Sequence, residues 1–187
     1  MPVDNMVVAV FNTHRGVEDA VQALQKAGSD TRNVSVAGKD HDTGEQLLAC
    51  YNSGGRVLDR GKYGGFWGTM WQMLSGSACF DMPRIGPVLV AGPLAARVFE
   101  ALSGASMVGG LSTVGAGLYS VGIPEASILE YESALQADKL LVLAHGEQDE
   151  VDRARATLDR TSPAALDVHD TFNPGPVAEG LEMAATL

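Results

Sequence analysis

The 187-residue chain is poor in cysteine and in basic side chains. Its two cysteines, Cys50 and Cys79, are too few for a disulfide framework, and neither lies at metal-ligand spacing from a histidine. We therefore expect a reduced, cytoplasmic setting. The N-terminal residues lack the basic and long apolar regions of a signal peptide, which also predicts a protein that is not exported.

Acidic side chains outnumber basic ones by 23 to 13, which gives a formal net charge of −10. Most of this excess lies in residues 124–187, which carry 13 acidic and 4 basic side chains. Such a surface repels phosphate backbones, so we expect no nucleic-acid partner. It also disfavours anionic lipid headgroups.

Charge of either sign is nearly missing between Gly61 and Ile123, where five charged side chains occur. The final stretch, residues 101–123, has none and contains six glycines. A segment of this kind has to be buried against its own domain, another copy of the chain or a membrane. Its length is sufficient to span a bilayer, but its small and polar residues make it less apolar than an ordinary membrane helix.

The two ends of the chain have ordinary α/β patterns. Residues 6–11 form a continuous apolar run, typical of a strand buried on both faces. A helical period follows over residues 17–27, Gly28 supplies a left-handed stop, and residues 33–37 predict a second strand.

The C-terminal part predicts the same order again. Pro124 suits the first position of a helix, since its missing N–H would be unpaired there. Residues 139–144 predict a buried strand, a helix with acidic residues in its first turn follows Gly146, and alternation over residues 164–170 predicts a half-exposed strand.

This double β-α-β order predicts the split βαβ ferredoxin-like sandwich, an α+β fold. We expect residues 1–53 and 124–170 to form the two halves of its core. Residues 54–123 are then a glycine-rich, apolar and largely helical insertion between the second and third core strands, and residues 171–187 are a tail.

Within the insertion, residues 46–51 at its approach and residues 85–95 have strand-like sequences. Pro87 and Pro93 interrupt the second of these, and we expect a helix to begin near Leu94.

Close packing is the other expectation for the insertion. As a helix, residues 101–123 would align a ridge of small residues at i+4 spacing, to which Ala105, Gly109, Thr113 and Gly117 belong, and such a ridge lets another backbone approach. Trp67 and Trp71 lie one helical turn apart in the aromatic run that precedes it. They are typical of a core or subunit interface, with a membrane anchor or a stacking platform as the alternative.

Two histidines are the candidate metal ligands. We expect the first and third core strands to be parallel neighbours, which would bring His14, after the first, close to His145, at the end of the third. Glu18 and Glu147 would then lie near enough to complete a two-histidine, carboxylate-assisted site. The alternative is that both histidines are solvated at the ends of loops.

Motifs for catalysis or cofactor binding are incomplete. Residues 55–62 are similar to a phosphate-binding loop, but the glycine spacing is one residue too long and Tyr63 replaces the magnesium-binding hydroxyl. Residues 110–114 lack the second glycine of a nucleophile elbow, and residues 115–120 lack the last glycine of a dinucleotide loop. We therefore expect no cofactor and no enzymatic activity.

The sequences GIPEASILEYESAL, residues 122–135, and ADKLLVLAHG, residues 137–146, resemble a family of small bacterial general stress proteins, some of which are described as membrane proteins. The similarity extends to IGPVLVAGPLA, residues 85–95, and to the first strand and helix. The resemblance implies a ferredoxin-like core with a glycine-rich insertion and an association with stress, and it implies no active-site residues.

The leading hypothesis is a non-enzymatic, stress-associated protein that forms homo-oligomers through its glycine-rich insertion, because large exposed apolar patches usually mark partners. Membrane association through the insertion, and a metal- or small-ligand-binding module that uses His14 and His145, are the alternatives.

Overall fold

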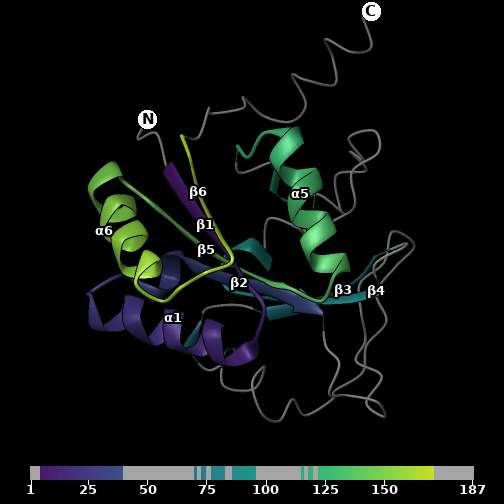
Figure 1. The fold of residues 1–187 in the computed structure, drawn as a ribbon, viewed down its shortest axis with the longest axis horizontal. Coiled ribbons are helices and arrows are strands. Elements are labelled where there is room, and N and C mark those ends of the chain that lie inside the picture. The colour runs from purple at the N-terminus through teal and green to yellow at the C-terminus, as the bar shows by residue number, and fades with distance from the viewer. Residues whose placement is uncertain are drawn as a thin grey trace, which may run out of the picture.

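A computed structural model of the chain describes residues 5–39, 70, 73–74, 77–82, 86–95, 115, 118–119 and 122–170. The described residues form a mixed α/β domain in which one antiparallel sheet carries helices on both faces (Figure 1). The elements follow in the order β1 (Asn5–Phe11), α1 (His14–Lys26), the 3-10 turn η1 (Thr31–Asn33), β2 (Val34–Lys39), β3 (Ser77–Met82), β4 (Gly86–Ala91), α5 (Glu125–Gln136), β5 (Leu140–Gly146), α6 (Gln148–Asp159) and β6 (Ala165–His169).

The sheet has the strand order β3-β4-β2-β5-β1-β6, and every neighbouring pair is antiparallel. Helix α1 connects β1 to β2 across β5, and α6 connects β5 to β6 across β1. Both helices pack on the same face of the sheet, side by side, while α5 covers part of the other face (Figure 1).

Apolar side chains alternate along the central strands and supply two core layers. In β1, Val7 and Ala9 join the cluster beneath α1 and α6, whereas Met6, Val8 and Val10 join the cluster beneath α5. All five side chains are buried. Burial on both faces explains why this strand is a continuous apolar run rather than an alternating one.

The helices form where their sequences predict, to within a few residues at their ends. The hydroxyl of Thr13 accepts a hydrogen bond from Gly16 N at 3.1 Å and caps α1, and Gly28 follows the helix with φ +84°. Pro124 is the N-cap residue of α5, so this helix begins one residue later than predicted. The buried residues of α5 are Ile128, Tyr131 and Leu135, as its spacing indicates.

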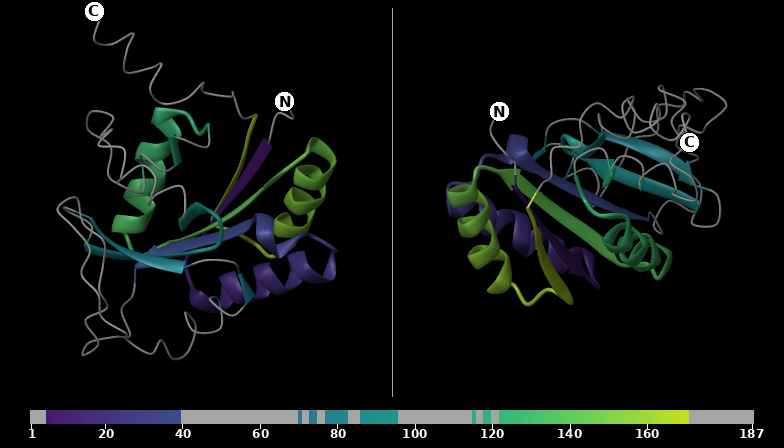
Figure 2. Two further views of the ribbon diagram at one scale, coloured as in Figure 1. Left: turned by 180° about the vertical axis from the view of Figure 1, so that it is seen from behind. Right: turned by 90° about the horizontal axis from the view of Figure 1, so that it is seen from above.

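The described strands of residues 54–123, the predicted insertion, extend the sheet beyond β2, on the side away from α6 (Figure 2). Strand β4 confirms the prediction for residues 85–95, but Pro87 does not interrupt it, because pairing with β2 begins only at Val88. Strand β3, which forms a hairpin with β4, was not predicted. The predicted strand at residues 46–51 and the tail at residues 171–187 lie outside the described residues.

After β4 the chain crosses back over β2. Gly92 has φ +96°, and a Cβ atom at this position would overlap Val34 O and lie 2.8 Å from Ser35 Cα. The buried hydroxyl of Ser35 then accepts a hydrogen bond from Leu94 N at 3.0 Å. Leu94 and Ala95 are buried in the layer of α5, and both are helical, in agreement with the predicted helix start.

None of the helices among the described residues combines the length and the apolar character that a bilayer-spanning helix needs.

Candidate functional site

The predicted pairing of His14 with His145 is wrong. Strand β5 runs antiparallel to β1, so His145 lies opposite Met6, whereas Phe11, three residues before His14, lies opposite Leu140. The five steps along the strand from Met6 to Phe11 span about 17 Å. The two histidines therefore lie at opposite ends of the sheet.

The two carboxylates are separated in the same way. Glu18 follows His14 on α1 at one end of the sheet, and Glu147 follows His145 at the other end. In the described parts of the chain, no three side chains of histidine, cysteine, aspartate or glutamate are grouped to hold a metal ion.

The predicted packing residues Trp67, Trp71, Ala105, Gly109, Thr113 and Gly117 lie outside the described residues. Gly115, in the same uncharged segment, is helical and packs against α5. A Cβ atom on Gly115 would overlap the Glu132 carboxylate and lie 3.1 Å from Ile128 Cγ2. This glycine therefore permits a close approach to a helix of the same chain.

A turn joins this segment to α5. Gly122 N donates to Tyr119 O at 3.0 Å, and Ile123 N donates to Leu118 O at 3.2 Å. Gly115, before this turn, lies beside Ile128, after it, so α5 runs back along the segment that precedes the turn. We call the described residues 115, 118–119 and 122–136 the helical hairpin.

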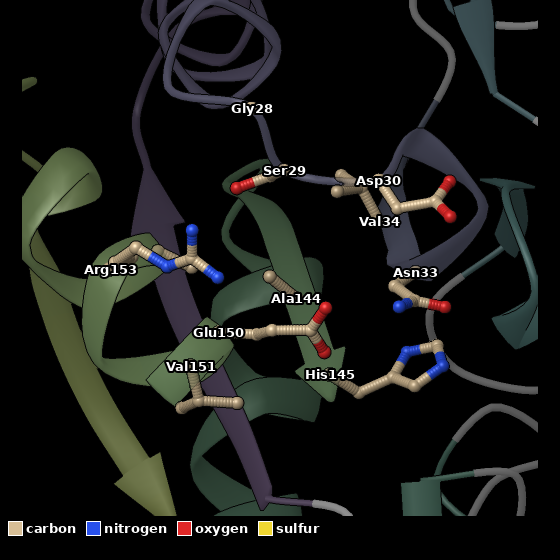
Figure 3. A pocket seen from close by; sticks show the side chains of 11 residues that line it. Gly28, Ser29, Asp30, Asn33, Val34, Ala144, His145, Glu150, Val151 and Arg153 are labelled. Atoms are coloured by element: carbon tan, nitrogen blue, oxygen red, sulfur yellow. The ribbon is translucent and has the colours of Figure 1, made fainter. Parts of the chain in front are cut away.

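A small pocket lies at the end of the sheet where β5 ends and β2 begins (Figure 3). Its volume is about 20 Å³, the space of about one water molecule. Its polar lining consists of Ser29, Asp30, Asn33, His145, Glu150 and Arg153.

Polar groups of this pocket already serve the local fold. Glu150 Oε2 accepts a hydrogen bond from Glu147 N at 3.1 Å, half of the capping box that begins α6. Arg153 Nε donates to Asp149 O at 3.3 Å on the same helix. The pocket is therefore a poor candidate for a substrate site.

A second polar cluster joins α5 to β6. The hydroxyl of Tyr131 lies 2.6 Å from His169 Nε2 and 3.5 Å from Asp167 Oδ2. The Tyr131 and His169 rings meet edge to face, with centroids 5.9 Å apart and planes at 84°. Tyr131 is only 2% exposed, so its hydroxyl depends on these neighbours for its hydrogen bonds.

Burial sets the protonation of this cluster. It raises the pKa of the Tyr131 hydroxyl, and the negative charge of Asp167 raises it further. Burial also lowers the pKa of His169, while Asp167 opposes that effect. At neutral pH the phenol therefore keeps its proton and the imidazole is neutral, so the hydroxyl can donate to Nε2.

The cluster joins a phenol on α5 to an imidazole and a carboxyl group on β6. The sequence did not predict this cluster, because the cluster depends on strand register: Met6 of β1 lies opposite both His145 and His169. The available signals were the tyrosine on the buried face of α5 and the Asp167/His169 alternation in β6.

Comparisons with models of known protein families, with curated proteins and with solved structures gave no match.

Proposed function

We propose that this protein is a non-enzymatic, stress-associated, cytoplasmic protein that forms homo-oligomers through the layer built by its glycine-rich insertion. The proposed core is a ferredoxin-like sandwich of the split βαβ type. The strand order β6-β1-β5-β2, with two crossover helices on one face, supports this fold. The stress association rests on the resemblance carried by residues 122–135 and 137–146.

The observation that carries the proposal is the position of exposed apolar side chains. Tyr119 and Leu129 are the large apolar residues exposed in the described part of the chain, at 36% and 49%. Both belong to the helical hairpin, one on each arm. The uncharged segment and α5 thus share the surface where a partner would bury further apolar area.

Charge supplies a second feature of this surface. Glu125 and Glu130 are exposed on α5 near Leu129 and carry like charges toward an identical partner. Repulsion between them weakens self-association at low ionic strength and is screened by salt. Homo-oligomers that use this surface should therefore become tighter as the salt concentration rises.

The test is a Leu129→Gln variant, with Ala156→Gln as the matched control. Ala156 is exposed on α6, in the opposite layer, so the same side chain is introduced away from the proposed interface. Full burial of a leucine side chain is worth about 1.5–3 kcal/mol, and Leu129 retains half of its exposure. Its burial in a symmetric dimer is worth about 2 kcal/mol in total, or about 30-fold in Kd.

Sedimentation velocity over a range of protein and salt concentrations measures this Kd. We expect Leu129→Gln to raise it about 30-fold, and Ala156→Gln to leave it within about twofold of the unchanged protein. Equal effects of the two variants would show that the helical hairpin is not the interface.

A further inference from the structure

Strand β6 is an edge strand that pairs only with β1 among the described strands. Its two faces are held differently. Leu166 and Val168 pack on the core beneath α1 and α6, whereas Asp167 and His169 point toward α5. The contact of His169 with Tyr131 therefore ties the edge of the sheet to the helix of the other layer.

The Tyr131 hydroxyl has one proton and two possible acceptors. When His169 is neutral, its Nε2 can accept that proton at the observed distance of 2.6 Å. When His169 is protonated, Nε2 becomes a donor, and the Tyr131 oxygen must accept. The phenolic proton then has Asp167 Oδ2 as its acceptor, now at 3.5 Å, a distance at which a hydrogen bond is weak.

We propose that Tyr131, Asp167 and His169 form a pH-dependent hydrogen-bond switch that sets how firmly strand β6 is held against α5. In the neutral state one short bond joins α5 to β6. In the acidic state Nε2 of His169 becomes the donor and the Tyr131 oxygen the acceptor. The contact between the Tyr131 hydroxyl and Asp167 then has to shorten before it can form a second hydrogen bond.

Several titratable groups form or surround the switch. In the described residues they are Tyr131 and Glu130 on α5, Asp167 on β6, Asp170 after it, and His145 on β5 beyond Met6. Strand β1 presents Met6, which does not titrate, and α6 packs on the opposite face of β6. The charge of Asp167 favours the protonated imidazole, so it reduces the loss of stability that His169 causes at acidic pH, without removing that loss.

The sign of the pH effect follows from burial. The pKa of His169 is lowered below its ordinary value of 6.5, so the folded chain binds this proton more weakly than the unfolded chain. The contribution of His169 to stability is therefore complete above pH 6.5. It falls as the pH drops from there through the folded pKa.

Two NMR measurements on the full chain test the switch: the imidazole titration of His169 and amide hydrogen exchange in β6. We expect His169 to titrate below 6.5, and the β6 amides to exchange about 3- to 10-fold faster, relative to those of β2, in the acidic state than in the neutral state. Intrinsic exchange rates at each pH are divided out first.

Tyr131→Phe removes the hydroxyl and keeps the ring. It should speed β6 exchange at pH 8 by about 3- to 10-fold, relative to β2. It should also reduce the pH dependence, because neutral Nε2 loses the hydroxyl that donates to it, while the part that comes from burial of His169 stays. Asp167→Asn removes the opposing charge, so the titration of His169 should shift to lower pH. His14→Gln, at the other end of the sheet, is the control and should change neither readout.

The β6-to-β2 comparison separates a local loss of the switch from a general loss of stability. A β6 pH dependence that is the same in the unchanged protein and in Tyr131→Phe would overturn the proposal. So would a His169 that titrates at its ordinary value, or one whose titration is unaffected by Asp167→Asn.

Discussion

Replacement of Gly92 by alanine tests how the chain packs on β2 after it leaves β4. Gly92 follows β4 with φ +96°, a conformation that residues with a Cβ atom rarely adopt. The added methyl group would also overlap Val34 O and lie 2.8 Å from Ser35 Cα and 2.9 Å from Ser35 Oγ. Two of these three neighbours are backbone atoms of β2, so a rotamer change cannot relieve the overlap.

The expected cost has two parts. A residue other than glycine in such a conformation costs about 1–3 kcal/mol, and forcing a methyl group into a packed site costs about 1–3 kcal/mol more. The sum is about 4 kcal/mol, a large fraction of the 5–15 kcal/mol typical of a whole domain. For a chain of this length it corresponds to a decrease in Tm of about 8–16 °C.

Gly28→Ala is the matched control. Gly28 has φ +84°, but no atom lies within 4 Å of a Cβ atom built there, so this variant loses only the conformational part, about 1 kcal/mol. Urea unfolding followed by circular dichroism at 222 nm gives both free energies. If Gly92→Ala costs no more than Gly28→Ala, the crossing of the insertion over β2 is not as described.

Two further variants probe the same layer. Ser35→Ala leaves the buried N–H of Leu94 without its acceptor and should lower the free energy of unfolding in urea by about 1–3 kcal/mol. Ser133→Ala removes an exposed hydroxyl and should lower it by under about 0.5 kcal/mol. Equal losses of stability in the two variants would contradict the role of Ser35. Gly115→Ala should change the Tm by only a few degrees, because the atom that its methyl group would meet is the far end of the flexible Glu132 side chain. Gly115→Leu should lower the free energy of unfolding by about 1–3 kcal/mol, because the larger side chain would overlap Ile128. A Gly115→Leu variant with unchanged stability would refute the helical hairpin.

Local sequence patterns predicted the strands and helices at the two ends of the chain, because those patterns coincide with burial. Helix α1 has its buried side chains at the predicted spacing up to Leu24, whereas Ala27 is exposed at the C-cap, and the continuous apolar run of β1 is buried on both faces. Strand β3 was missed because SACFDM, residues 77–82, has no long apolar run and no regular apolar/polar alternation.

Strand direction could not be obtained from these patterns. The prediction that the first and third core strands are parallel placed His14 beside His145, whereas the observed antiparallel pairing separates them. The antiparallel pairing of β6 with β1 places His169 within reach of Tyr131 on the helix layer above the sheet. Contacts between residues far apart in sequence depend on register and direction, which local periodicity does not encode.

The mass of the unchanged protein in solution tests the central claim most directly. Sedimentation velocity at micromolar concentrations, with and without a mild detergent, distinguishes the possible partners of the insertion. We expect a mass that is a multiple of 19.6 kDa, increases with protein concentration and is reached without detergent. A 19.6 kDa monomer at every concentration, or a protein that remains in solution only with detergent, would contradict it.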